Sequence, residues 1–333
     1  MENYTPPTLF KNPHVQSIMA SAGPRKLIMR RRAKKLTDSA TTHILDCGNG
    51  IRLQGEYSQH ADNNKGLVIL IHGWLGGNDS MYLLSSANAL FLDGFNVFRL
   101  NLRDHGGSGH LNRGLFNSAR LDEVVNAVHQ VQQLFPHPYN YLAGFSLGGN
   151  FVLRVANKAP ANNIALDKVV SVCPVINPGK TNVNIKQGLF IYHDYFYKKW
   201  KRSLLKKLDH FPEYDYREKL KTLKTLDEMT QYFVHNHTDF DNIDEYLKGY
   251  SIDGDYLSEL AVPCHIISSI DDPVIEAKDL RQLSQSPQLI VELTRYGGHC
   301  GYIDSFKLTS WIDRRLKELM SPACNNSAHS IVT

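Results

Sequence analysis

Ser146 lies in the pentapeptide Gly-Phe-Ser-Leu-Gly, residues 144–148, between two runs of different character. The run 139–143 before it resembles a strand, and residues 149–156 after it resemble a helix. A serine at a sharp strand-to-helix turn is held in a strained backbone conformation, and flanking glycines let neighbouring backbone pass close by. The N-terminus of the helix then lies beneath the hydroxyl. The pattern predicts an exposed nucleophile, and the alternative is an ordinary glycine-rich turn.

His299 is the predicted general base for this serine. It lies among glycines in residues 296–301, directly after the strand-like run 289–293. Glycines around a histidine at a strand end allow a loop to deliver the imidazole to a serine on a neighbouring strand. Cys300 adjoins the histidine, but Ser146 remains the better nucleophile because of its turn.

Two adjacent aspartates could orient the imidazole. Asp271 and Asp272 both end the strand-like run 265–270. We choose Asp272 because Pro273 follows it, and proline rigidifies the turn that would hold the carboxylate. Asp271 is then expected to cap the turn or to be solvated. The resulting chain order is serine, aspartate, histidine.

The oxyanion hole requires two backbone N–H groups aimed at the developing negative charge. Leu147, the residue after the nucleophile, is expected to supply one of them. The apolar run 67–71 flows into His72 and Gly73, which reads as a buried central strand with a tight turn. Trp74 in that turn is the expected second donor. We interpret His72 as hydrogen-bonding the loop rather than as a catalytic group.

Several of these segments together make the chain similar to a known family. The similar segments are residues 10–18, 72–77, 103–109, 144–150, 271–273 and 297–301. The chain resembles the YheT-like branch of the α/β-hydrolases over about residues 8–318, and the Asn-Pro-His element at the start is more specific to that branch than the serine turn. The resemblance implies an α/β-hydrolase fold and activity on acyl esters, as described for esterases and lipases of the branch.

The coarse pattern of the chain alternates strands and helices, which predicts a mostly parallel sheet covered on both faces. Strands are predicted at 43–47, 51–58, 67–72, 96–101, 139–145, 168–174, 265–270 and 289–294. Helices are predicted at 79–92, 117–134, 147–158, 276–284 and 305–319. The first two strands flank a Gly-Asn-Gly turn and are expected to form an antiparallel hairpin at one edge.

The predicted fold class is therefore α/β, an α/β-hydrolase core with an inserted helical cap. We assign residues 1–40 to an N-terminal arm, 41–175 and 256–320 to the core, 176–255 to the cap, and 321–333 to a flexible tail. The cap segment lacks a buried-strand pattern and mixes aromatic, basic and acidic residues. We expect it to cover the active site and shape an acyl pocket. The alternative is a helical excursion packed away from the site.

Bulk composition is typical of a soluble globular protein. The chain has 333 residues, of which 42% are hydrophobic and 21% charged, and its net charge is only +4. Its five cysteines are odd in number and lack paired spacing, which suggests a reducing, cytoplasmic compartment. No signal peptide is expected in the first 40 residues, and no apolar run approaches the length of a membrane span.

Other ligands are not expected. No cofactor is predicted, and no metal, because the histidines at 235 and 237 lie in a polar stretch that reads as a solvated loop. The basic cluster at 25–35 lacks the aromatic pattern or module of a nucleic-acid site. Peripheral membrane contact is an alternative, through a stripe of Phe190, Tyr197, Leu204 and Leu208 flanked by lysines. The competing interpretation is that this stripe packs on the protein.

The predicted function is hydrolysis of a small-molecule or lipid acyl ester through an acyl-enzyme. Ser146 attacks the carbonyl, His299 takes its proton, and Asp272 orients the imidazole. Trp74 and Leu147 bind the oxyanion. The alternatives are an acyltransferase that uses the same triad and a catalytically silent binding protein. The presence of all three triad residues argues against the silent protein.

Overall fold

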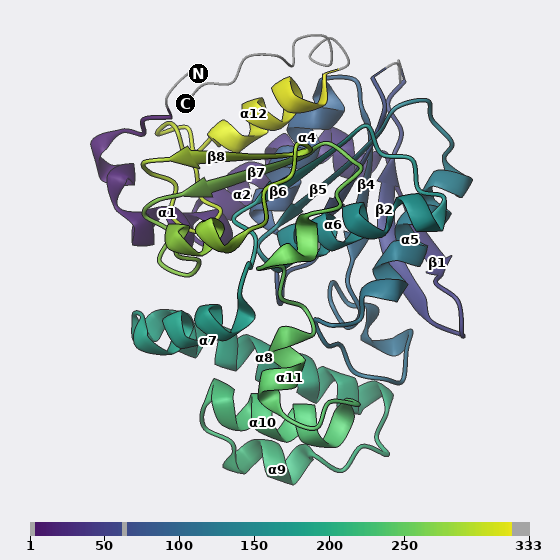
Figure 1. Ribbon diagram of the computed structural model, residues 1–333, viewed down its shortest axis with the longest axis vertical. Helices are drawn as coiled ribbons and strands as arrows, with labels where there is room; N and C mark the ends of the chain where they lie inside the picture. Colours follow the sequence, from purple (N-terminus) through teal and green to yellow (C-terminus); the bar gives the residue numbers. More distant parts are fainter. Residues whose placement is uncertain (1–3, 62–64, 322–333) are drawn as a thin grey trace.

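The fold is built on one sheet of eight strands in the order β1-β2-β4-β3-β5-β6-β7-β8 (Figure 1). The structure is a computed structural model that describes residues 4–61 and 65–321. The strands are β1 (Ala40–Asp46), β2 (Arg52–Ser58), β3 (Leu67–Ile71), β4 (Asn96–Asn101), β5 (Asn140–Phe145), β6 (Lys168–Val172), β7 (Cys264–Ser269) and β8 (Leu289–Thr294). All eight correspond to predicted strands.

The sheet is parallel except at one edge. β1 and β2 form an antiparallel hairpin, and β2 pairs antiparallel with β4. From β4 to β8 every pairing is parallel. The hairpin closes where the Cys47 N–H donates to the Ile51 carbonyl over 2.8 Å, at the predicted Gly-Asn-Gly turn. In parallel strands the carboxyl ends lie at one edge, so the loops after β3, β5, β7 and β8 can meet there.

Helices cover both faces of the sheet, and the central strands are buried on each side. α5 (Leu121–Leu134) and α6 (Leu147–Lys158) pack on one face, and α4 (Met81–Leu92) and α12 (Trp311–Met320) on the other (Figure 1). β3 shows the alternation of a strand, since Ile69 packs with the first layer and Leu70 with the second. A strand that faces apolar layers on both sides needs the continuous apolar run seen in its sequence.

Two predicted helices differ from the structure. The helix expected at 276–284 is a short 3-10 helix, η5 (Ala277–Gln282), in which the Asp279 N–H donates to the Glu276 carbonyl. The helix expected at 305–319 begins only at Trp311, because its N–H donates to the Tyr302 carbonyl and the chain between them folds back as a turn. The remaining 3-10 helices of the core are η2 (Ser108–His110), η3 (Pro160–Asn162) and η4 (Asp255–Leu257).

Two further groups of helices lie outside the sheet layers. The N-terminal arm contains η1 (Thr8–Lys11), α1 (Pro13–Ser21), α2 (Arg25–Arg32) and α3 (Lys34–Asp38). The cap helices are α7 (Pro178–Gln187), α8 (Phe190–His210), α9 (Arg217–Thr222), α10 (Leu226–His237) and α11 (Ile243–Lys248). Figure 1 shows the cap helices as a layer at one end of the sheet. Apart from Ser321, the predicted C-terminal tail lies outside the described residues.

The cap helices form a small hydrophobic cluster together with Leu115 of the loop after β4. Its buried members are Leu115, Leu204, Leu208, Tyr216, Leu220, Leu223, Met229 and Phe233. Tyr197 packs against this cluster, whereas Phe190 is 76% exposed. The stripe considered for membrane contact is therefore wrong as a lipid-facing surface, because three of its four residues pack inside the cap. Within the part of the chain described, no helix is long and apolar enough to cross a membrane.

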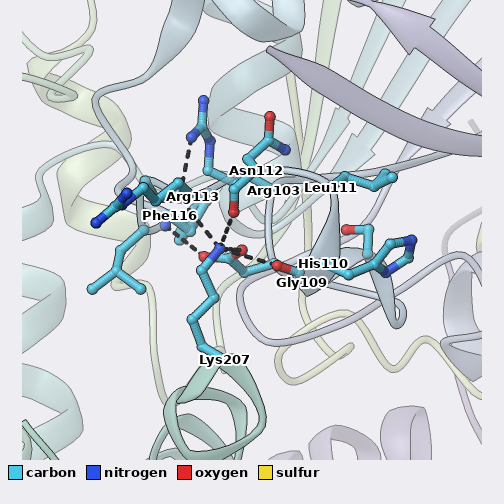
Figure 2. Close-up of polar contacts among 12 residues, drawn as sticks. Arg103, Gly109, His110, Leu111, Asn112, Arg113, Phe116 and Lys207 are labelled. Atoms are coloured by element: carbon cyan, nitrogen blue, oxygen red, sulfur yellow. Dashed lines mark hydrogen bonds and ion pairs between the residues drawn. The ribbon is translucent and has the colours of Figure 1, made fainter. Parts of the chain in front are cut away.

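A buried lysine fastens the cap to the core. Lys207 of α8 points into the loop after β4, and its side chain is 1% exposed (Figure 2). Its ammonium group donates to Asp104 Oδ1 over 2.7 Å, to the Gly109 carbonyl over 3.1 Å and to the Asn112 carbonyl. The other oxygen of Asp104 accepts the Phe116 N–H over 2.8 Å. A buried ammonium needs this full set of acceptors, since burial without partners disfavours the charge.

The ionisation of this pair reflects two opposing effects. Burial raises the pKa of the Asp104 carboxyl and lowers the pKa of the Lys207 ammonium. The opposite charge of each partner counteracts both shifts. Removing one partner therefore leaves the other as an uncompensated buried charge.

We expect Lys207→Met to destabilise the protein by about 3 kcal/mol, because it leaves Asp104 buried without its cation. Urea unfolding measures the loss. Lys206→Met is the matched control, since Lys206 is the exposed neighbour on the same helix, and it is expected to change stability by less than about 0.5 kcal/mol. Equal effects of the two substitutions would show that the buried pair does not anchor the cap.

Candidate active site

Ser146 stands on a strained turn between β5 and α6. Its φ is 55° and its ψ is −118°, a conformation that non-glycine residues rarely adopt. The turn is crowded, because a Cβ at Gly144 would lie 2.2 Å from the Gly148 carbonyl oxygen. A Cβ at Gly148 would lie 2.4 Å from the Ile71 carbonyl oxygen of β3. The two glycines are thus required for close backbone approach, as the sequence predicts.

A continuous hydrogen-bonded chain joins the serine to an aspartate through the histidine. His299 Nε2 lies 2.9 Å from Ser146 Oγ, and His299 Nδ1 lies 2.9 Å from Asp272 Oδ2. The other carboxylate oxygen of Asp272 accepts the N–H groups of Val274 and Ile275 over 2.8 and 3.0 Å. The turn that contains Pro273 therefore fixes the carboxylate, and the side chain is 1% exposed.

Asp271 has a different role from its neighbour. Its Oδ1 accepts the Gly298 N–H over 2.9 Å, so it braces the loop that carries His299 and does not contact the imidazole. Burial raises the pKa of the Asp271 carboxyl, and the bond from Gly298 opposes that shift. The two adjacent carboxylates therefore differ in their contacts: Asp272 binds the imidazole, and Asp271 binds the backbone of the loop.

The histidine is poised to accept a proton. Burial by itself lowers the pKa of His299, but the charge of Asp272 and its hydrogen bond raise it by more, so the pKa lies above the usual 6.5. The bond from Nδ1 to Asp272 leaves Nε2 facing the serine hydroxyl. This arrangement can deprotonate Ser146 and hold the resulting positive charge.

Two buried histidines brace the loop after β3. His72 Nε2 accepts the Leu102 N–H over 3.1 Å, and its Nδ1–H donates to the Gly73 carbonyl over 2.7 Å. His105 Nε2 accepts the Leu75 N–H over 2.9 Å. Burial lowers the pKa of His72 well below its usual value and that of His105 to about 4. Both rings are neutral hydrogen-bonding struts at neutral pH, which agrees with the interpretation of His72.

Trp74 and Leu147 lie beside the serine on the wall of one cavity. The backbone N–H groups around Trp74 are engaged, that of Gly73 by the Tyr82 hydroxyl and that of Leu75 by a histidine. Within the residues that the structure describes, the N–H groups of Trp74 and Leu147 have no hydrogen-bond partner. Both groups are thus free to bind an oxygen of a substrate.

The N-terminal arm holds the loop of His299, a role that the sequence did not reveal. The His299 N–H donates to Ser17 Oγ over 2.8 Å, and this hydroxyl donates to the Pro13 carbonyl over 2.7 Å. Gln16 Oε1 accepts the Ile303 N–H on the far side of the loop over 2.7 Å. The arm thus supplies acceptors for backbone N–H groups of the loop that would otherwise lack a hydrogen-bond partner.

Close packing reinforces these bonds. A Cβ at Gly298 would lie 2.4 Å from the Pro13 carbonyl oxygen, and one at Gly301 would lie 2.6 Å from that of Gln16. The glycines beside His299 therefore admit the backbone of α1. The Asn-Pro-His element in the sequence was the signal that could have revealed this role of the arm. Asn12 caps α1 by accepting two backbone N–H groups and so positions the helix.

The cavity above the serine is large and mostly apolar, with a volume of about 860 Å³. Core residues such as Ser146 and His299 form its floor, and cap residues such as Phe196 and Trp200 close it. Trp74 joins the two parts, with its ring 5.4 Å from that of Phe196 and 5.5 Å from that of Trp200. The cap segment thus covers the site and forms one side of its pocket.

One set of side chains has metal-ligand types. The sulfurs of Cys173 and Cys300 and a ring nitrogen of His299 lie within 4.8 Å of one another. Both ring nitrogens of His299 are already bonded to Asp272 and Ser146. A metal here would break that chain of hydrogen bonds, so the geometry favours proton transfer.

A family model described as alpha/beta hydrolase fold matches residues 66–306. The protein YheT of Escherichia coli (strain K12) is 22% identical over 321 residues, which cover 94% of this chain and 91% of YheT. Phospholipase ABHD3 of Homo sapiens is 22% identical over 266 residues, 76% of this chain and 63% of ABHD3.

A solved structure shows the same architecture. The esterase Pf2001 of Pyrococcus furiosus superposes with a TM-score of 0.57 at 16% identity, over 86% of this chain and 94% of that chain. At this identity the likeness concerns the fold.

We expect Ser17→Ala to lower kcat about tenfold, because the backbone of His299 loses its acceptor and the imidazole is placed less accurately. Ser21→Ala is the matched control, since both serines belong to α1 and line the cavity. Ser17→Thr keeps the hydroxyl and is expected to restore most of the rate. Equal kcat values for the two alanine variants, measured on a soluble ester, would contradict the positioning role.

Proposed function

This chain belongs to the alpha/beta hydrolase fold family, and on that premise we propose that it is a serine hydrolase that cleaves carboxylic esters. The observation that carries the proposal is the chain of hydrogen bonds from Asp272 through His299 to Ser146 beneath an apolar cavity. Those three side chains come from loops after three different strands. Their distances of 2.9 Å are those of a nucleophile, a base and an orienting acid.

The proposed reaction has two halves. Ser146 Oγ attacks the ester carbonyl while its proton passes to His299 Nε2, and Asp272 stabilises the imidazolium. The N–H groups of Trp74 and Leu147 bind the oxyanion of the tetrahedral intermediate. The alcohol leaves with the proton from His299. A water molecule then gives its proton to the same nitrogen while its oxygen attacks the acyl carbonyl. When this second tetrahedral intermediate collapses, the bond to Ser146 Oγ breaks, His299 returns the proton to Ser146 Oγ, and the acid leaves.

The proposed substrate is a lipid-like acyl ester. A cavity of about 860 Å³ walled by tryptophan, phenylalanine and tyrosine favours a long apolar chain over a small polar ester. The name of the relative ABHD3, a phospholipase, supports the same class. The reaction requires no group beyond the side chains and backbone of this chain and water.

We expect Ser146→Ala to abolish labelling by a fluorophosphonate probe and turnover of p-nitrophenyl esters, because the proposed nucleophile is removed. Cys300→Ala is the control, since Cys300 lines the same cavity and is expected to retain labelling. Thermal unfolding of both variants verifies the fold. Undiminished labelling of Ser146→Ala, or its loss in Cys300→Ala, would overturn the assignment of the nucleophile.

Substitution of the two aspartates is expected to lower kcat to very different extents. Asp272→Asn should lower kcat by about 10⁴, as when a triad acid is neutralised, and Asp271→Asn far less. Because Asp272 raises the pKa of His299, wild-type activity should fall as the pH drops through a value above 6.5, where the base becomes protonated. Residual activity of Asp272→Asn should fall only at lower pH. The opposite ranking of the aspartates would assign the role to Asp271.

A further inference from the structure

Large apolar side chains are exposed together where α8 begins. Leu189 is 48% exposed, Phe190 76%, Ile191 51% and Tyr195 40%. Single exposed apolar residues are common on soluble proteins. A contiguous group instead marks a surface that binds a protein, a membrane or a ligand. The group lies at the start of α8, where the cap contacts the N-terminal arm.

This exposed group reaches the wall of the active-site cavity. Ile191 and Tyr195 line the cavity, and so does Ile18 of α1, which is 40% exposed. α1 and α8 meet there, because His14 Nδ1 and the Tyr192 hydroxyl form a 2.9 Å hydrogen bond. We call Ile18, Leu189, Phe190, Ile191 and Tyr195 the apolar rim.

Unpaired basic residues flank the apolar rim. Lys26 of α2 lines the cavity, and Arg30 follows one turn later on the same face of the helix. Both are exposed, α2 contains no acidic residue, and neither has a carboxylate partner among residues 4–61 and 65–321. Among the basic residues of α8, Lys198 differs, since it is paired with Asp194 over 2.8 Å.

We propose that the apolar rim docks on an anionic lipid surface, with Leu189 and Phe190 inserted and Lys26 and Arg30 against the headgroups. An apolar edge flanked by basic residues has the chemistry of an interfacial membrane contact. A second copy of this chain suits the site less well, because it would present the same basic face and a net charge of +4. A docked lipid surface would also place acyl chains at the mouth of the cavity, which is where the proposed function requires them.

Vesicle sedimentation tests the proposal, and the Ser146→Ala chain serves as parent so that hydrolysis cannot alter the vesicles. The probes are vesicles of phosphatidylcholine alone and of phosphatidylcholine with phosphatidylserine, each at low and at high salt. We expect binding to the anionic vesicles that weakens with salt. Lys26→Gln with Arg30→Gln should weaken the partition coefficient about thirtyfold, since each basic residue near the surface contributes a similar share.

Leu189→Ser with Phe190→Ser should weaken binding by more than about tenfold, because the inserted side chains are lost. The matched controls are Lys219→Gln with Lys221→Gln on α9 and Leu92→Ser with Leu134→Ser, which remove equal charge and two similarly exposed leucines elsewhere. The controls should bind as the parent does, and thermal unfolding verifies that each variant is folded.

Three results would overturn the proposal: no salt-sensitive binding by the parent, equal losses in the rim variants and their controls, or a concentration-dependent dimer that the Leu189 and Phe190 substitutions abolish. The dimer, detected by light scattering, would make a second copy the occupant. Because binding is measured in a chain that lacks Ser146, its outcome is independent of the proposed hydrolysis.

Discussion

The 2.9 Å contact between His299 Nε2 and Ser146 Oγ depends on two backbone segments that are both held from outside. The serine is fixed by a strained turn that only glycines at 144 and 148 permit, because the β3 and α6 backbones pass within van der Waals distance. The histidine is in a loop whose own turn bonds run from the Gly301 and Tyr302 N–H groups to the Gly297 carbonyl. That loop is held by Asp271 from the core side and by Ser17 from the arm. Proton transfer tolerates little displacement, so these supports matter as much as the reacting groups.

The arm is therefore part of the active site in a physical sense. Its helix α1 bonds the backbone of His299 through Ser17 and spans the same loop through Gln16. It also reaches the cap through the bond from His14 to Tyr192. One short helix thus connects the base, the loop after it and the wall of the pocket. Its cap residue Asn12 fixes where the helix begins and hence which of its side chains face the loop.

Helix α8 has three tasks along its length. Its first turn contributes to the apolar rim, its middle provides Phe196 and Trp200 to the cavity, and Lys207 near its end fastens it to the core. Lys207 lies eight positions after Lys199 of the cavity wall, about 12 Å along the helix. A rigid helix fixed at one end by a buried charge can hold the pocket wall in place, and the ammonium is costly to release because its acceptors would be exposed or unpaired.

The sequence by itself determined the strands, the turn at Ser146 and the residue types that surround it, because these follow from local apolar runs, glycines and the spacing along the chain. It identified His299 as the base and favoured Asp272 over Asp271 as the acid because Pro273 follows it. Only the tertiary structure decided that Asp272 reaches the imidazole while Asp271 binds the Gly298 N–H. Ser17 and His299 are 282 positions apart, and Lys207 meets a loop about one hundred residues earlier. Such pairs leave no local pattern, since packing of distant elements selects them. For the same reason the sequence left open whether the apolar stripe of α8 meets lipid or protein: periodicity defines a helix face, but only its neighbours decide whether that face meets protein or solvent.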